Sequence, residues 1–567
     1  MAGKHTGYRF GIIFVQIKRM KRGLIFITIL WMISSICMGQ QKPSKINNGI
    51  DRPKLVVGLV IDQMRWDYLF RYADSYGTGG FKRLLKQGFS FENTIIPYTP
   101  TVTAAGHACL YTGSVPAVHG IVGNDWIERD GEKSMYCAQD KSVNSVGTAS
   151  KQGQMSPRNM LSNTIGDELR LASNFNSRVY GIALKDRGGI MPAGHSANAA
   201  YWFDDSTGHW ISSSYYMNNL PSWVSEYNDQ KKPDSFMKID WNLLYPQSTY
   251  HQSTTDDKAY EKPLNHEKQK TFPHIYSTQI GKGYFPIRQS PYGNTITFDF
   301  AKQLIQQEKL GASGQTDMIC ISLSSTDYVG HRFGPNSMEL EDMYLRVDLE
   351  LAQFLQYLDK TVGENNYLFF LSADHGAPQV PDFMKENKIP AGNLRNPQLM
   401  KELNAACAGK YKDSLLVKGI FEYTIYLNMP RIDSLQLDVN AIKNTVLSYL
   451  KSKPEVMYAF DYAAFDKAIL PANIKERFAN GYFYKRSGDI QYILKPQYTD
   501  VLSTGTEHGT WYNYDAHIPL LWYGWKIKPG KSNREVYMTD VAPTIAAMLK
   551  IQMPNGSVGK VLLEILQ

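Results

Sequence analysis

Four largely apolar runs constrain the fold of this chain more than any other feature of its sequence. They cover residues 54–61, 178–184, 317–323 and 367–373, and polar residues bound each of them. An apolar run without alternation is typical of a strand that is buried on both faces, as in a parallel sheet. Segments with helical spacing lie between these runs, so their order predicts an α/β fold with a mostly parallel central sheet.

Further elements extend this pattern along the chain. Spacing and composition predict helices over 79–88, 104–111, 159–173, 294–310, 337–363, 441–452 and 539–550, and a last strand over 518–524. Two stretches, at about 196–292 and 378–496, have weaker periodicity. We therefore predict one catalytic domain over 40–567 with two insertions, which form a cap or subdomain.

The N-terminus has the order of a secretory signal. Six Lys and Arg residues and no acid occupy the first 23 positions, and an apolar run over 24–36 follows, which is too short to span a membrane comfortably. We predict a signal peptide over 1–39 and a periplasmic or secreted mature protein without a stable membrane span. Met20 is an alternative start, and a lipid anchor on Cys37 is disfavoured because the bulky Ile36 precedes it.

The charge of the chain argues against a nucleic-acid partner. The formal net charge is +8, and six positive charges precede residue 24, so the remainder carries 8 − 6 = +2. Such a balance gives no basic surface for a nucleic-acid backbone. The four cysteines of the remainder show no C-x-x-C pattern, and a pairing of Cys109 with Cys137 stays open.

A candidate nucleophile follows the Pro-containing stretch 99–102. Thr103 stands directly before the small, helix-compatible run 104–111. The N-terminus of a helix carries a partial positive charge, which favours an alkoxide on the threonine and an anion beside it. The alternative is that Thr103 only caps the helix.

Two cations follow the second apolar run. In an extended segment Lys185 and Arg187 would point to the same side, with Asp186 opposite. Two cations on one face at a strand end are a candidate clamp for a doubly charged anion. The alternative is a solvated charged face.

Metal-type ligands stand in several separate clusters. Asp62 and the pair Asp374–His375 directly follow apolar runs, while Asp327 and His331 lie four apart in a segment that we expect to be a loop or a single turn. His508 lies in a loop before the last strand. Carboxylate and neutral imidazole suit zinc, and three Asp with three His could hold two divalent ions.

The motifs that carry these residues resemble, in their order, those of the alkaline phosphatase superfamily. They are T-V-T-A-A-G-H at Thr103, G-N-D-W at Asn124, K-D-R at Lys185, S-T-D-Y-V-G-H at Asp327, A-D-H-G at Asp374 and T-E-H-G-T at His508. Within the superfamily the chain is similar to the PafA-type, phosphate-irrepressible alkaline phosphatases over residues 54–561. The resemblance implies a three-layer α/β sandwich.

The resemblance also implies a phosphomonoesterase with two Zn²⁺ ions per chain. One ion would be held by Asp327, His331 and His508 and the other by Asp62, Asp374 and His375, with Thr103 also in contact. Thr103 would attack phosphorus and form a phospho-threonine that water then hydrolyses. The non-bridging phosphoryl oxygens would be bound by Asn124, Lys185 and Arg187. The partners would be small phosphate monoesters, and a monomer is expected.

Three other functions compete with this one. A phosphodiesterase or nucleotide pyrophosphatase of the same fold is the main alternative, and the Lys185/Arg187 pair argues against it. A sulfatase is disfavoured because Cys109 lacks the C-x-P-x-R setting. An exported binding or adhesion protein that uses the aromatic insertion is the non-enzymatic alternative, and metal-dependent turnover of a phosphate ester would exclude it.

Export generates the first testable prediction. Because the basic segment precedes the apolar run 24–36, the mature protein should begin near Gln40. N-terminal sequencing of protein from the periplasmic fraction measures this. An intact N-terminus, or a lipid on Cys37, would contradict the prediction.

Overall fold

The computed structural model describes residues 50–265, 267–501 and 504–566. The predicted signal peptide and Cys37 lie outside these residues. A compact unit that begins at Arg52 contains every element described below. Within the described residues, no helix combines the length and the apolar character that a membrane crossing requires.

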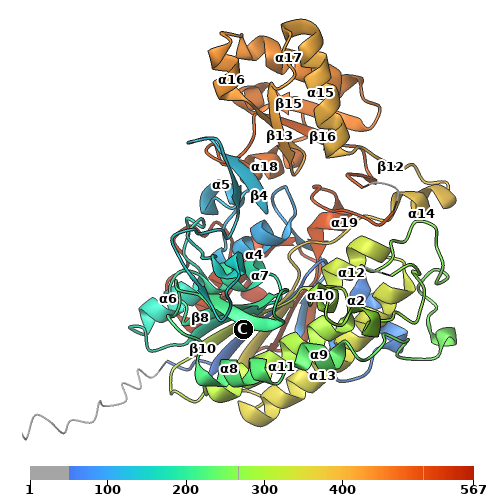
Figure 1. Cartoon of the computed structure of the whole chain (residues 1–567). Coiled ribbons are helices and arrows are strands. Elements are labelled where there is room, and N and C mark those ends of the chain that lie inside the picture. The colour runs from blue at the N-terminus through green and yellow to red at the C-terminus, as the bar shows by residue number, and fades with distance from the viewer. Residues whose placement is uncertain (1–49, 266, 502–503, 567) are drawn as a thin grey trace, which may run out of the picture. The chain divides into compact units, whose positions relative to one another are not determined.

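A ten-stranded sheet forms the centre of this unit (Figure 1). Its middle consists of five parallel strands in the order β11 (Tyr367–Ser372), β1 (Leu55–Ile61), β10 (Asp317–Leu323), β7 (Val179–Ala183) and β8 (Ala199–Asp204). The outer strands are β20 (Gly530–Ser532), β2 (Phe89–Phe91) and β19 (Leu520–Gly524) on one side, and β9 (His209–Ser213) and β6 (Ser145–Val146) on the other. The predicted mostly parallel sheet is therefore confirmed.

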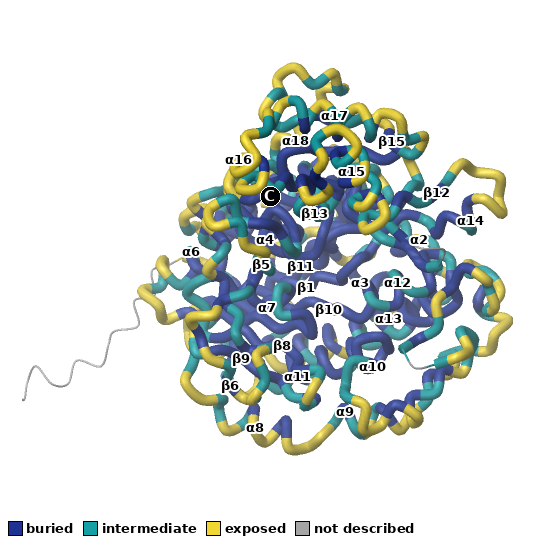
Figure 2. The backbone as a smooth tube through the Cα atoms, turned by 45° about the horizontal axis from the view of Figure 1, so that its top comes forward, coloured by how far each residue is buried: buried dark blue, intermediate teal, exposed yellow. Residues whose placement is uncertain are grey.

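Helices cover both faces of this sheet. One layer contains α4 (Thr103–Thr112), α6 (Ile165–Ala172), α7 (Asp186–Ala193) and α20 (Val541–Leu549), and the other contains α3 (Phe81–Gln87), α11 (Pro291–Gln307) and α13 (Met338–Thr361). Strand β8 shows the two faces: Ala200 and Trp202 pack into the core beneath α4 and α7, whereas Tyr201 packs against Phe300 of α11. The strands β1, β10 and β11 are buried throughout (Figure 2). The result is the three-layer α/β sandwich.

A second, antiparallel sheet lies within residues 417–494. Its order is β13 (Val417–Phe421), β14 (Thr424–Leu427), β16 (Ile490–Leu494) and β15 (Val456–Asp461). The helices α15 (Asn396–Tyr411) and α17 (Val439–Ser452) share with it an apolar core of its own, separate from that of the main sheet. This sheet falls inside the stretch that we expected to be an insertion.

Three local predictions were wrong. The segment 199–213, expected within an insertion, forms β8 and β9 of the main sheet, because its aromatic residues alternate between two buried faces. The segment 185–187 is not extended, since α7 begins at Asp186, whose acid favours the first turn of a helix. Asp327 and His331 lie on a nine-residue helix, α12 (Ser325–Phe333), with the acid in its first turn and the histidine in its last.

The cysteines stay separate. Cys109, Cys137, Cys320 and Cys407 are all buried free thiols in the described part of the chain. The pairing of Cys109 with Cys137, which the sequence left open, is therefore not formed.

Helix α4 approaches the end of β11 closely at one glycine. A Cβ atom on Gly106 would lie 2.4 Å from the carbonyl oxygen of Asp374 and 2.7 Å from its Cβ. These neighbours belong to backbone and to the root of a side chain, so they cannot move aside cheaply. Gly106 thus lets α4 pack directly against the strand end.

This contact predicts the effect of adding one methyl group. Gly106→Ala should lower the free energy of unfolding by about 1–3 kcal/mol, as overpacking of a dense core does. The matched control is Gly409→Ala on α15, where an added Cβ meets nothing within 4 Å. There, helix propensity should raise stability by about 0.5–1 kcal/mol. Urea unfolding of both variants measures the difference, and equal effects would contradict the role of Gly106.

Candidate active site

The parallel register brings the first ligands to one edge of the sheet. Ile61 pairs with Leu323 and Val60 pairs with Ser372, so the residues that follow these strands leave the sheet side by side. In open α/β sheets the ligand site lies beyond these carboxyl ends. Here Asp62, Asp374 and His375 form one group whose ligand atoms all lie within 4.8 Å of one another, and all three are buried.

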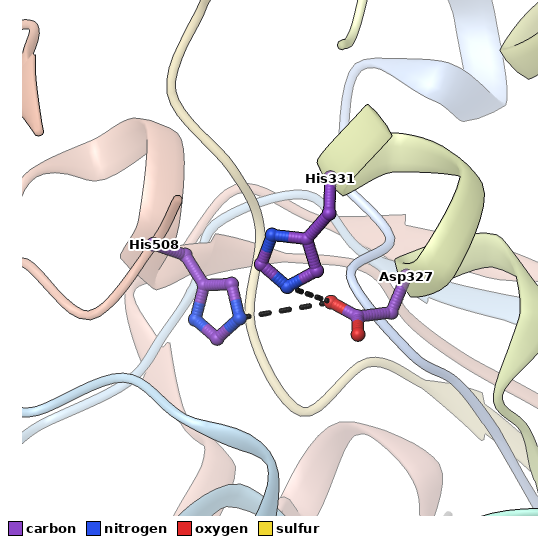
Figure 3. A group of neighbouring side chains, drawn as sticks. All are labelled: Asp327, His331 and His508. Carbon is purple, nitrogen blue, oxygen red and sulfur yellow. Dashed lines mark ion pairs between the residues drawn. The ribbon is translucent and has the colours of Figure 1, made fainter. Parts of the chain in front are cut away.

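A second group lies beside the first. Asp327 and His331 are one helical turn apart on α12, and His508 comes from the loop before α19 (Asn513–Ala516) (Figure 3). The Nε2 atoms of His331 and His508 lie 3.1 and 3.6 Å from Oδ1 of Asp327. The structure therefore brings all six predicted ligands together, in the two groups that the resemblance implies.

The three histidines share one orientation. Each places Nδ1 on a backbone carbonyl: His331 on Thr506 at 2.8 Å, His375 on Gly376 at 3.0 Å and His508 on Thr101 at 2.8 Å. A carbonyl oxygen only accepts, so in the neutral ring Nδ1 carries the proton and Nε2 presents its lone pair to the cluster. This arrangement is typical of metal-binding histidines.

The first group also contains buried polar atoms that make no hydrogen bond. Among the described residues, Asp62 Oδ1, Asp374 Oδ2 and His375 Nε2 are buried and make no hydrogen bond. Buried polar atoms left unpaired cost free energy, and natural proteins seldom tolerate several at one place. A divalent cation would satisfy all three at once, so the residues present fit a metal ion.

Lys185 lies between the two groups. Its Nζ contacts Asp62 Oδ2 at 2.7 Å, Asp327 Oδ2 at 2.5 Å and Thr103 Oγ1 at 3.4 Å. Burial lowers the pKa of Lys185, but the two carboxylates raise it further than burial lowers it, so the ammonium stays charged. Burial, and then repulsion by Asp374, raises the pKa of Asp62 well above its usual value.

Thr103 is not a helix cap. The N-cap of α4 is Val102, no side-chain cap is made there among the described residues, and Thr103 is the first helical residue. The capping alternative is therefore wrong, and the hydroxyl faces Lys185 instead. Beside it, Asn124 Oδ1 accepts the backbone N–H of Ala104 at 3.1 Å, which orients the amide next to the same helix N-terminus.

Arg187 has a different hydrogen-bond partner from Lys185. Its Nη1 donates to the hydroxyl of Tyr136 at 3.1 Å, whereas Lys185 contacts the ligand carboxylates. Lys185 is the N-cap of α7 and Arg187 lies in its first turn, so the two cations are close in sequence but have different partners. The extended segment that would have placed both cations on one side, with Asp186 opposite, is not formed.

Sequence reasoning missed two residues that contact predicted site residues. Gln63 donates its backbone N–H to Asp374 Oδ1 at 3.1 Å and its side-chain Nε2 to Asp327 Oδ1 at 2.6 Å, so it links both groups. Its φ of 64° is unusual for a residue other than glycine. Tyr136 contacts Arg187. Neither residue type carries a signal for such a role.

Comparison with known proteins agrees with this geometry. The family described as type I phosphodiesterase / nucleotide pyrophosphatase matches residues 56–515. The chain is 47% identical over 553 residues to alkaline phosphatase PhoV of Synechococcus elongatus, which covers 97% of this chain and 100% of the relative. It is 49% identical over 523 residues to a protein named calcium-transporting ATPase from Myroides odoratus. That match covers 91% of this chain and 95% of the relative. A crystal structure of alkaline phosphatase PafA matches with a TM-score of 0.90 and 45% sequence identity. That match covers 91% of this chain and 100% of the PafA chain.

The unpaired ligand atoms predict a stability change that does not depend on activity. Zn²⁺ in excess over chelator should raise the melting temperature, since an ion at 100 times its Kd stabilises a site by about 2.7 kcal/mol. Asp62→Asn should remove the part of this rise that the first group contributes, while the second group, Asp327, His331 and His508, keeps the remainder. Asp130→Asn is the control, because Asp130 is an exposed residue of the 129–132 turn. An identical rise in both variants would contradict the assignment.

Proposed function

From its membership of the type I phosphodiesterase / nucleotide pyrophosphatase family, and of the alkaline phosphatases within it, we propose that this chain is an exported zinc enzyme that acts through a phospho-threonine. It is a phosphoric monoester hydrolase, which releases an alcohol and inorganic phosphate. The observation that carries the mechanism is the position of Thr103, at the N-terminus of α4 and with its hydroxyl 3.4 Å from the Lys185 ammonium that contacts both ligand groups.

The metals proposed are two Zn²⁺ ions per chain. One would be held by Asp327, His331 and His508, and the other by Asp62, Asp374, His375 and the oxygen of Thr103. Imidazole Nε2 and carboxylate oxygen suit zinc. When bound, the ions supply Lewis acidity at the attacking and leaving oxygens.

The chain's own residues supply the nucleophile and its setting. A threonine hydroxyl is a weak nucleophile, and the partial positive charge at the first turn of α4 favours its alkoxide. Oγ1 of Thr103 attacks phosphorus, the bond from phosphorus to the leaving oxygen breaks, and the alcohol departs. Water then attacks the phospho-threonine and returns Thr103 with inorganic phosphate.

Three side chains are proposed to bind the phosphoryl oxygens. The Oδ1 atom of Asn124 is engaged by Ala104, so its Nδ2 hydrogens are the atoms left to donate to substrate. Lys185 and Arg187 add charged donors. Fixed donors of this kind, aimed at developing charge, are each worth about 2.7–4 kcal/mol in known enzymes.

The alternatives are weaker. A diesterase of the same family would have less use for Lys185 and Arg187. A phosphate diester has one negative charge fewer and one free oxygen fewer than a phosphate monoester. The name of the ATPase relative agrees with this proposal. The terminal phosphoryl group of ATP has three free oxygens, as the phosphoryl group of a monoester has. Export is supported by the basic and apolar order of the N-terminus, and the substrates proposed are small phosphate monoesters.

The nucleophile is tested by Thr103→Ala. This variant should lose nearly all turnover of an aryl phosphate, because it lacks the attacking oxygen, while both metal ions stay bound through the three Asp and His ligands of each group. Thr103→Ser should retain much more activity, since it keeps the hydroxyl. Steady-state kinetics with elemental analysis of each variant measures both properties. Turnover near the wild-type rate in Thr103→Ala would assign the attack to water, and a wild type that prefers a methyl aryl diester would favour the diesterase.

A further inference from the structure

A β-hairpin directly follows Asn124. Its strands are β4 (Asp125–Glu128) and β5 (Lys133–Tyr136), and Asp125 pairs with Tyr136 at their open end. The pairing continues beyond the strands, because the N–H of Cys137 donates to the carbonyl of Asn124 at 2.9 Å. Asn124 and Tyr136 therefore lie at the same end of one hairpin.

The hydroxyl of Tyr136 joins Arg187 to a carboxylate. Nη1 of Arg187 donates to this hydroxyl at 3.1 Å, and the hydroxyl is also hydrogen-bonded to Oδ1 of Asp186. A guanidinium only donates, so the single phenolic proton goes to Asp186. The same Oδ1 accepts the backbone N–H of Arg187 at 2.6 Å. Burial raises the pKa of Tyr136, which keeps the phenol neutral.

This arrangement holds Arg187 without pairing its charge directly. Among the described residues the guanidinium makes no ion pair with a carboxylate, and its Nε is buried without a hydrogen-bond acceptor. A carboxylate in direct contact would occupy the two parallel N–H groups that bind phosphate in bidentate fashion. A neutral phenol between Arg187 and Asp186 leaves most of these donors for a substrate.

We infer that Tyr136 and Asp186 are positioning residues that orient Arg187 toward a phosphoryl dianion, and that the hairpin joins Arg187 and Asn124 in one phosphate-binding unit. This inference rests on the proposed phosphomonoesterase function. Neither residue touches the reacting atoms in this scheme. Their effect should therefore depend on Arg187 and should appear only with substrates that need it.

The test is a double-mutant cycle of Tyr136→Phe and Arg187→Ala. Tyr136→Phe keeps the ring and removes the hydroxyl, so kcat/KM for an aryl phosphate should fall roughly tenfold, the value of one hydrogen bond to a charged group. The rate with the corresponding methyl diester should change less than about twofold, and in the Arg187→Ala background the same substitution should also change the monoester rate less than about twofold. The inhibition constant of inorganic phosphate should rise in parallel with the monoester loss.

The matched control is Tyr180→Phe. Tyr180 stands near the start of β7, away from Lys185, and its hydroxyl also donates to a carboxylate, that of Glu308, at 2.9 Å. Its loss should leave both rates unchanged. Should Tyr136→Phe fail to fold, Asp186→Asn tests the same connection, with a smaller loss confined to the monoester.

Two results would overturn the inference. One is an equal loss on monoester and diester in Tyr136→Phe, and the other is an undiminished effect of that substitution in the Arg187→Ala background. The wild-type preference for the monoester is measured in the same assay. If that preference is absent, the proposed function fails, whereas a preserved preference with either result above overturns only the role of Tyr136.

Discussion

Repulsion among buried carboxylates at one edge of the parallel sheet is the constraint on which the rest of this site depends. Asp62, Asp374 and Asp327 are all buried there, and burial together with Asp374 raises the pKa of Asp62 well above its usual value. Burial would raise the pKa of Asp327 too, but His331 and Lys185 lower it. Buried charges are costly unless they are paired. The fold therefore needs cations here, and Lys185 alone cannot contact every unpaired oxygen.

The surrounding elements serve to keep the ligands in position. Backbone carbonyls orient the three histidines, and Gln63 links Asp374 to Asp327. Gly106 lets α4, and with it Thr103, pack against the end of β11. These contacts come from rigid elements and from backbone atoms, so small displacements of the nucleophile relative to the ligands are resisted. Such support is what a site needs when geometry decides the rate.

The sequence predicted what depends on local pattern. Strands β1, β7, β10 and β11 were recognised because a strand buried on both faces needs an apolar run, and the ligands at their ends followed from the common edge. The helix that carries Asp327 was missed, since a short polar segment with glycines also suits a loop. Strands β8 and β9 were missed because their many aromatic residues resemble those of a surface insertion.

Other features depend on contacts between distant segments, which no local pattern contains. Tyr136 reaches Arg187 only because the hairpin folds back on Asn124 and then packs against the start of α7, 50 residues further along the chain. Gln63 links the two ligand groups from a left-handed backbone conformation, which is unusual for glutamine and is not predicted by its residue type. The sequence could not show whether Cys109 and Cys137 pair, because a disulfide depends on the distance between the two thiols in the fold. In the structure both thiols are free.

Selectivity in the proposed mechanism must come from these positioned donors. Two metal ions would serve the attacking and leaving oxygens of a monoester and of a diester alike. The substrates differ in their free, non-bridging oxygens. A monoester has three of them, whereas a diester has two. Donors on Asn124, Lys185 and Arg187 would match the three, whereas a diester would leave one of them facing its substituent. A donor left unpaired in such a site costs about 1–3 kcal/mol, and more when it is charged. The hairpin that joins Asn124 to Arg187 would therefore determine the selectivity for the monoester. The metals would supply the catalysis that both esters require.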